Sequence, residues 1–210
     1  TWKERLGKEW LFFDGGMGTI LQENGLKAGE LPETWNISHP DAIQSLHRAY
    51  LEAGADIINT NTFGANGLKY KEDGEYSLKH VIESAVALAK RAREETGRTD
   101  AYIALDIGPT GKLLKPMGDL AFEDAYELFK EVVLIGTEAG ADLILIETMS
   151  DTYEAKAAVL AAKENSSLPV IATMIFGENG KLLTGADPAA VVALLEGLSV
   201  DALGMNCGLG

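Results

Sequence analysis

Polar side chains end most of the short apolar runs in this chain of 210 residues. These residues are Asp14, Asn59 or Asn61, Asp106, Glu147, Thr173, and the adjacent pair Asn206 and Cys207. Carboxylates hold cationic groups, amides and hydroxyls orient a ligand by hydrogen bonding, and a thiolate binds metals such as zinc. If the runs are parallel strands, these side chains meet at one edge of the sheet, where barrel enzymes build their active sites.

The apolar runs alternate with longer stretches of helical period, which is the pattern of βα units around a parallel sheet. Each run is nearly continuous in apolar residues, as expected of strands that are covered on both faces. We predict six strands, at Trp10–Asp14, Asp56–Thr60, Ala101–Asp106, Leu143–Glu147, Pro169–Met174 and Ala202–Cys207.

The predicted helices carry recognisable start and stop signals. Apolar residues spaced by three, four and seven positions predict a helix over 40–53. The sequence EAGAD occurs at 52–56 and again at 138–142, where Gly54 and Gly140 are expected to end a helix in the left-handed conformation. Two helix starts carry capping signals, which are Asp151 with Glu154, and Asp187 followed by Pro188.

Consecutive βα units form either an open doubly wound sheet or a closed barrel of eight strands. The segment Asp14–Gly18 reads DGGMG, which lacks the G-x-G-x-x-G spacing of dinucleotide sites and begins with an acidic residue. The barrel is therefore favoured. A complete one needs about 250 residues, so we expect an α/β fold, a TIM (β/α)8 barrel truncated after its sixth strand, in one domain over residues 1–210.

Charge and composition exclude several classes of partner. Lys and Arg number 18 against 32 for Asp and Glu, and the net charge of −14 disfavours nucleic acid and anionic membrane surfaces. No apolar run approaches the ~20 residues that cross a bilayer, and the first ten residues lack the features of a signal peptide. The single cysteine, Cys207, excludes an internal disulfide, so a cytoplasmic location is the simplest expectation.

Six motifs together resemble the homocysteine S-methyltransferase family, almost from end to end of the chain. They are DGGMGT (14–19), PDAIQSLHRAYLEAGADIINTNTFGAN (40–66), DIGPTG (106–111), LIETMSD (145–151), LTGADP (183–188) and GMNCGLG (204–210). Through NTNTFGAN and DIGPTG the chain is most similar to the homocysteine-binding domain of cobalamin-dependent methionine synthases.

The resemblance implies a methyltransferase that methylates the thiol of homocysteine to give methionine. It also implies zinc held by three cysteine thiolates, of which Cys207 matches the first and the other two have no counterpart here. We therefore expect the zinc site to be incomplete and this chain to be inactive alone. A metal would deprotonate the substrate thiol, since a free thiol has a pKa of about 8.5. Without the resemblance, a lone cysteine after an apolar strand is more often a small buried hydrophobe.

By the same resemblance, Asp14 and Glu147 receive the ammonium group of homocysteine. The backbone N–H groups of Gly15 and Gly16 are candidates for its carboxylate. The residues alone leave alternatives open: Asp14 is also suited to a turn that bonds the following glycines, and Glu147 to a charge at the start of a helix.

Three further residues are candidates at the same edge of the sheet. Asn61 and Asp106 are expected to bind substrate, each with a structural hydrogen bond as the competing role. Asn206 is expected to orient the loop that carries Cys207. Surface or packing roles are favoured for the histidines, which are His39, His47 and His80.

The methyl donor is not determined by these motifs. The resemblance favours methylcobalamin, delivered by the cobalamin and folate domains of a parent protein, but users of betaine and S-methylmethionine share the motifs. A lyase or aldolase barrel would need a lysine at a strand end to form a Schiff base, and no predicted strand ends in one. The remaining alternative is an inactive structural half-barrel that needs a missing C-terminal segment.

Overall fold

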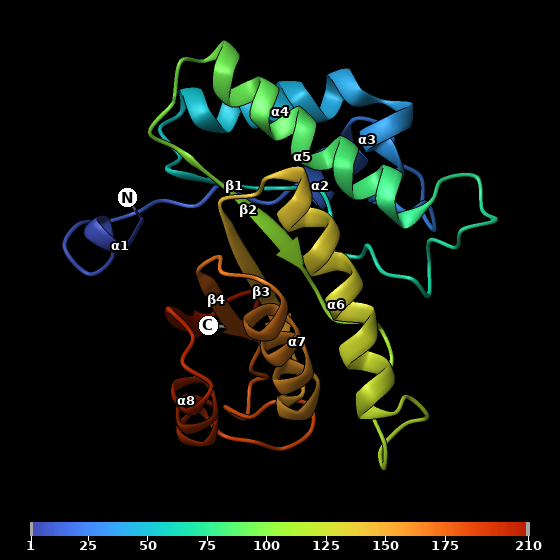
Figure 1. Cartoon of the computed structure of the whole chain (residues 1–210), viewed down its shortest axis with the longest axis vertical. Coiled ribbons are helices and arrows are strands. Elements are labelled where there is room, and N and C mark those ends of the chain that lie inside the picture. Colours follow the sequence, from blue (N-terminus) through green and yellow to red (C-terminus); the bar gives the residue numbers. More distant parts are fainter. Residues whose placement is uncertain (1, 209–210) are drawn as a thin grey trace.

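Five parallel strands form one sheet in the computed structural model, which describes residues 2–208 (Figure 1). They are β1 (Ile57–Asn59), β2 (Tyr102–Ile107), β3 (Leu143–Met149), β4 (Val170–Met174) and β5 (Ala202–Met205). The strands lie in the order of the chain, and each neighbouring pair is parallel. Five of the six predicted strands are thus confirmed, with ends that differ by two residues or fewer.

Long helices precede the strands one by one and lie on the outer side of the sheet (Figure 1). They are α4 (Pro40–Glu52), α5 (Leu78–Glu95), α6 (Phe122–Ala139), α7 (Thr152–Asn165) and α8 (Pro188–Gly197). Each packs on the next in chain order, as consecutive βα units of a barrel do. The N-terminal part holds the short helices α1 (Trp2–Arg5), α2 (Gly18–Glu23), η1 (Pro32–Thr34) and α3 (Trp35–Ser38).

The first predicted strand, Trp10–Asp14, is wrong. This segment lies beside β1 and forms a single bridge, Phe13 with Ile57, supported by the bond from the Asp14 N–H to the Ile57 carbonyl at 2.9 Å. Trp10 is 88% exposed and Phe12 is 63% exposed. A strand of a parallel sheet is stabilised by neighbouring strands on both sides. Within residues 2–208 this segment has a single neighbouring strand, β1.

The EAGAD segments end their helices as predicted. Gly54 has a φ of +106° after α4, and Gly140 has a φ of +89° after α6, a conformation that is strained for residues with a Cβ. The cap of α8 is also confirmed, because the Asp187 carboxylate accepts a bond from the Ala190 N–H at 2.9 Å.

The capping pair predicted for α7 is half right. Asp151 caps the helix by accepting the N–H groups of Tyr153 and Glu154 at 3.2 and 3.1 Å. The Glu154 carboxylate does not return to the cap. Instead it accepts the backbone N–H and the hydroxyl of Thr110 at 2.8 and 2.6 Å, and so ties α7 to the loop after β2.

The inner face of the sheet carries an apolar layer, followed toward the carboxyl ends of the strands by a polar layer. Trp2 from α1 packs beneath this face, against inner residues of four strands, which are Ile57, Ala104, Leu143, Leu145 and Ile171. Side chains on one face recur every second residue, so the next inner positions toward the carboxyl ends are polar. These positions are Asn59, Asp106, Glu147 and Thr173.

His47 in α4 is fully buried, and neither of its ring nitrogens has a hydrogen-bond partner among residues 2–208. The packing role predicted for His47 fits this burial. Burial lowers the pKa of His47 to about 4, because the cationic imidazolium is poorly solvated inside the fold.

We expect acid to destabilise the fold through His47. The unfolded chain binds this proton below about pH 6.5, whereas the folded chain excludes it down to a pH of about 4, so the free energy of unfolding falls as the pH drops between these values. Between pH 7.5 and 5 the free energy of unfolding, measured with urea, should fall by roughly 1–2 kcal/mol less in His47→Leu than in the unsubstituted chain. His80→Leu, at an exposed position of α5, is the control, and equal pH dependence in both variants would contradict the assignment.

Candidate active site

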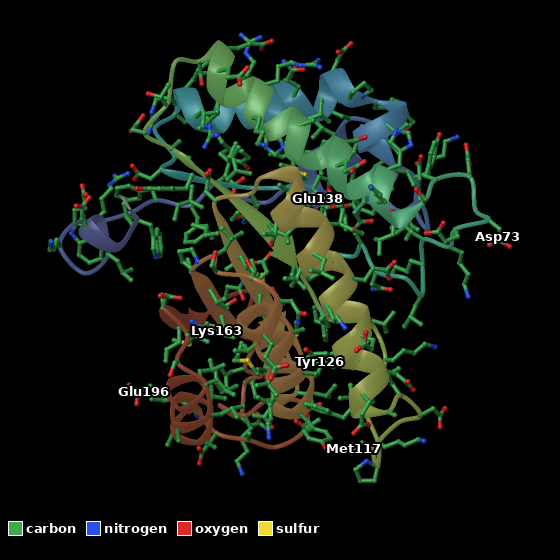
Figure 2. The ribbon with its side chains drawn as sticks, in the orientation of Figure 1. Asp73, Met117, Tyr126, Glu138, Lys163 and Glu196 are labelled. Carbon is green, nitrogen blue, oxygen red and sulfur yellow. The ribbon has the colours of Figure 1, made fainter. Side chains whose placement is uncertain are left out.

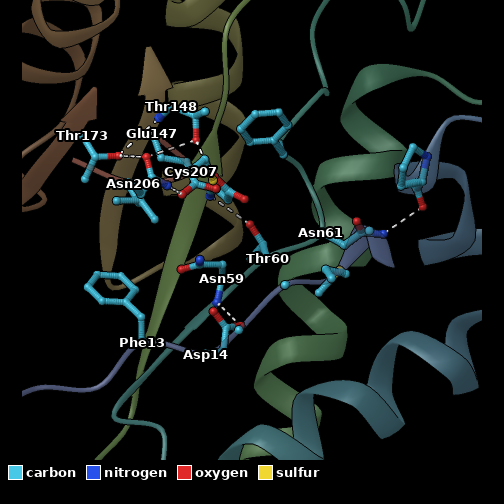
Figure 3. Close-up of a pocket in the computed structure, with 18 of the residues that line it drawn as sticks. Phe13, Asp14, Asn59, Thr60, Asn61, Glu147, Thr148, Thr173, Asn206 and Cys207 are labelled. Carbon is cyan, nitrogen blue, oxygen red and sulfur yellow. Dashed lines mark hydrogen bonds between the residues drawn. The ribbon is translucent and has the colours of Figure 1, made fainter. Parts of the chain in front are cut away.

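A cavity of about 610 Å³ lies at the carboxyl ends of the strands. Asn59, Asp106, Glu147 and Thr173 line it from four successive strands, and Figure 3 shows that side chains from both ends of the chain meet there. Further residues complete the wall, which are Glu33 from η1, Thr148 from β3, and the loop residues Asp14, Phe63, Asn206 and Cys207. The convergence of polar strand ends predicted from the sequence is therefore present.

Three of the carboxyl groups that line the cavity, those of Asp14, Asp106 and Glu147, affect each other's ionisation. Burial raises the pKa of Asp14 to about 7, with repulsion from Glu147 adding to the shift. Burial also raises the pKa of Asp106 well above its ordinary value, and the charges of Glu147 and Asp14 raise it further. Burial raises the pKa of Glu147 as well, although hydrogen bonds from Asp106 and Asn206 oppose that shift. Burial and mutual repulsion therefore oppose full ionisation of Asp106 and Glu147 together, and the hydrogen bond between them raises the pKa of Asp106 while it lowers that of Glu147.

The cavity is an environment for cations. Of the described residues that line it, none is Lys, Arg or His, while four are carboxylic acids, which are Asp14, Glu33, Asp106 and Glu147. One carboxyl oxygen of Asp14 and one of Asp106 are buried without a hydrogen-bond partner in the described chain. Buried acceptors of this kind are costly unless a donor reaches them, and a ligand ammonium group is such a donor.

Asn206 connects Glu147 to the neighbouring strand ends. Its amide Nδ2 donates to Glu147 Oε2 at 2.7 Å, and its Oδ1 accepts from the Thr173 and Thr148 hydroxyls at 2.9 and 3.3 Å (Figure 3). The Thr148 hydroxyl also lies 3.9 Å from the Cys207 Sγ. The carboxylate, the amide and the thiol therefore belong to one connected group.

Cys207 is exposed and reduced. No group of three or more His, Cys, Asp or Glu side chains within residues 2–208 is placed to hold a metal ion. A catalytic zinc site takes three protein ligands and leaves one position open. The described residues contribute one thiol and do not by themselves fit a zinc ion.

Two of the sequence motifs, NTNTFGAN (59–66) and DIGPTG (106–111), pack against each other beside the cavity. Gly108 donates its N–H to the Phe63 carbonyl at 2.9 Å, and a Cβ at Gly108 would lie 2.6 Å from Phe63. Glycine thus allows the DIGPTG loop to approach the NTNTFGAN loop. The Thr62 hydroxyl adds a bond to the Asp106 carbonyl at 2.7 Å, which holds the carboxyl end of β2 in place.

Comparison with known proteins identifies the family. The family model described as Homocysteine S-methyltransferase matches residues 11–209. The chain belongs to the homocysteine S-methyltransferase family. It is 33% identical to the methionine synthase of Mycobacterium tuberculosis over 94% of its own length, and 31% identical to that of Mycobacterium leprae over 99%. The chain spans 18% of the length of each of these relatives.

Solved structures of the homocysteine methyltransferase MmuM from Escherichia coli have the same fold. The oxidized form is 25% identical, with a TM-score of 0.85 over 98% of this chain and 76% of that one. The metallated form is also 25% identical, with a TM-score of 0.83 over 96% and 76% of the two chains. The sheet is thus the incomplete barrel predicted from the sequence, with five strands where six were expected.

The substrate candidates differ in how free their polar atoms are. Asn61 lies in the cavity wall, but its Nδ2 already donates to the Pro32 carbonyl at 2.9 Å and to Asn36 Oδ1 at 3.0 Å. Gly15 is pressed against Tyr50, whose hydroxyl would lie 2.7 Å from an added Cβ, whereas Gly16 has open space there. Asp14 accepts the Asn59 N–H at 2.8 Å through one oxygen and leaves the other free for a ligand.

Sequence reasoning missed Glu33, Phe63, Thr148 and Met205, which also line the cavity. Glu33 is buried and accepts the Gly64 N–H at 2.6 Å and the Tyr70 hydroxyl at 2.9 Å. In the sequence it lies in a short helix, many residues from the nearest strand end, so no local pattern predicts its place in the cavity wall. Thr148 follows Glu147 directly, and its φ of +61° is a property of the folded chain alone.

Features remote from the cavity add no candidate groups to it. Met117 lies near the end of the loop between β2 and α6, away from the carboxyl ends of the other strands, and is 60% exposed (Figure 2). Among the helices of residues 2–208, none has the length and apolar character needed to span a membrane.

We predict that Asp106→Asn stabilises the fold at neutral pH. The raised pKa means that the folded chain keeps the Asp106 proton where the unfolded chain has lost it, so this carboxyl group costs stability as the pH rises above its unfolded value. An amide can still donate to Glu147 but does not ionise. The melting temperature should rise by a few degrees at pH 7.5, and the gain should shrink toward pH 4. Asp119→Asn, at an exposed position, is the control; no gain at pH 7.5 for Asp106→Asn would show that Asp106 is ionised.

Proposed function

We propose that this chain binds homocysteine for methylation of its thiol, as the homocysteine-binding part of a methionine synthase. Family membership and the two methionine synthase relatives support the activity. The observation that carries the proposal is the presence of Glu147 and Cys207 in the wall of one cavity of about 610 Å³. Homocysteine carries an ammonium group that suits the Glu147 carboxylate and a thiol that could share with Cys207 the zinc implied by the resemblance.

The ammonium group of the substrate is proposed to lie among the carboxyl groups. Asp14 and Glu147 are its primary partners, and Asp106 supports them through its bond with Glu147. The ammonium cation balances the negative charge of the three neighbouring carboxyl groups, and it donates hydrogen bonds to the buried oxygens of Asp14 and Asp106. Since no cationic side chain lines the described cavity, the substrate carboxylate is assigned to backbone N–H groups near Gly16.

The proposed reaction is a displacement at a methyl group. The homocysteine sulfur forms a bond to the methyl carbon, the bond from that carbon to the donor breaks, and the donor keeps the electron pair. The thiol proton is lost before or during this step. The resemblance assigns thiol activation to zinc, for which Cys207 would be one ligand, and two further ligands are required from outside residues 2–208.

The proposed donor is methylcobalamin, carried with folate chemistry by other domains of a longer protein. This arrangement is supported by the short span of the chain, which covers 18% of the length of each methionine synthase and leaves most of that length to other parts of those proteins. The resemblance keeps betaine and S-methylmethionine as alternative donors, because users of both share these motifs. Methyl transfer assays with methylcobalamin, betaine and S-methylmethionine on the parent protein distinguish them.

Glu147→Gln is expected to weaken homocysteine binding by roughly 1.5–3 kcal/mol, the range for a hydrogen bond to a charged group. The amide keeps the size of the side chain but cannot attract the ammonium charge. Calorimetric titration with L-homocysteine measures the effect. Glu196→Gln, at an exposed position of α8, should leave the dissociation constant unchanged, and an unchanged constant for Glu147→Gln would reject the substrate role.

The 210-residue chain alone is expected to hold little zinc and to transfer no methyl group to homocysteine. It offers one thiol to the metal where three ligands are required. A longer chain of the parent protein that carries the remaining ligands should do both, and Cys207→Ser in that chain should lose the metal. Plasma emission after chelation measures the zinc. Stoichiometric zinc that resists chelation in the 210-residue chain would overturn this prediction and would point to other ligands.

A further inference from the structure

We infer that Asn206 is a positioning residue for substrate binding, which fixes the orientation of the Glu147 carboxylate toward the cavity. The inference rests on the proposed function, because Glu147 is the partner assigned to the homocysteine ammonium group. Asn206 itself need not touch the substrate. Its effect is exerted through the bond from Nδ2 to Glu147 Oε2 at 2.7 Å.

The amide of Asn206 has one orientation that satisfies its neighbours. The Thr173 hydroxyl accepts the Thr148 backbone N–H at 3.2 Å and therefore has its single proton free for Asn206 Oδ1 at 2.9 Å. With a hydroxyl donor on one side and a carboxylate on the other, the amide oxygen must face Thr173 and the amide nitrogen must face Glu147. A flipped amide would set its oxygen against the carboxylate.

The bond from Asn206 decides which oxygen of Glu147 remains for a ligand. A carboxylate side chain rotates freely about its last bond in solution, whereas here Oε2 is held by Asn206. The other carboxyl contact of Glu147 is with Asp106, which lies in the wall of the same cavity. The carboxylate plane is thus set from two sides, and the substrate ammonium group meets an acceptor that is already oriented.

The adjacent backbone explains why this position is suited to the role. Cys207 has a φ of +55° and Thr148 a φ of +61°, conformations that cost energy for residues with a Cβ and that cluster at functional sites. Asn206 follows β5, where its N–H donates to the Met174 carbonyl at 3.2 Å. Its side chain connects the end of β5 to Thr173 in β4 and to Glu147 in β3, so contacts with two neighbouring strands help to fix the Glu147 carboxylate.

The test is a double-mutant cycle on the 210-residue chain, with L-homocysteine titrated calorimetrically. Asn206→Ala should raise the dissociation constant about tenfold. In the Glu147→Gln background the same substitution should change it less than about twofold, because there is no charge left to orient. Asn165→Ala removes an asparagine that donates to the Tyr126 hydroxyl and the Ala161 carbonyl, away from the cavity, and should have no effect in either background.

Equal effects of Asn206→Ala in both backgrounds would show a general structural role and overturn the inference. An unchanged constant for Asn206→Ala, with Glu147→Gln still weakening binding, would overturn the inference and leave the proposed function standing. If Glu147→Gln has no effect, both are rejected. Should Asn206→Ala fail to fold, Thr173→Val tests the same point. It removes the hydroxyl that orients the amide, and it should weaken binding several-fold only when Glu147 is present; Thr137→Val, which removes a hydroxyl bonded to Ser166, is its control.

Discussion

The buried carboxyl group of Asp106 sets the charge balance on which the whole cavity depends. It lies close to the charges of Glu147 and Asp14, and none of the described lining residues brings a cationic side chain. Full ionisation of the three groups is therefore unfavourable, and a proton or a cationic ligand must make up the difference. Under the proposed function, the substrate ammonium group is the cation that fulfils this requirement, and the site would then favour an amino acid over a neutral thiol of similar size.

The loops hold Asp106 in this position through its backbone. Its N–H donates to the Thr60 hydroxyl at 3.1 Å, and its carbonyl accepts from the Thr62 hydroxyl at 2.7 Å. The next turn is tied to α7 by Glu154 through Thr110. These bonds help to keep Asp106 buried, and burial is the main cause of its raised pKa.

Local sequence patterns correctly predicted the parts of this fold that are determined by residues close together in the sequence. Apolar runs located five strands, and the left-handed glycines Gly54 and Gly140 ended their helices as expected. Predictions were wrong where a partner distant in the sequence decides the outcome. Among residues 2–208, the segment around Phe13 pairs with β1 alone, and Glu154 bonds Thr110 instead of its own helix end. The polar residues that end the apolar runs indicated Asn59, Asp106 and Glu147, but the contribution of Glu33 depends on contacts that no local pattern contains.

The rim formed by β5 owes its geometry to side chains more than to the sheet. Within the described chain β5 pairs with β4 alone, and Met205 is 75% exposed, so few ladder bonds restrain the residues that follow it. The side-chain bonds of Asn206 to Thr173 and Glu147 add to its backbone bond with Met174 and help to connect this rim to its neighbours. Since the thiol of Cys207 comes next in the chain, the position of the thiol depends on the same amide that orients the carboxylate. Under the proposed function, recognition of the ammonium group and placement of the Cys207 sulfur are therefore linked by one side chain.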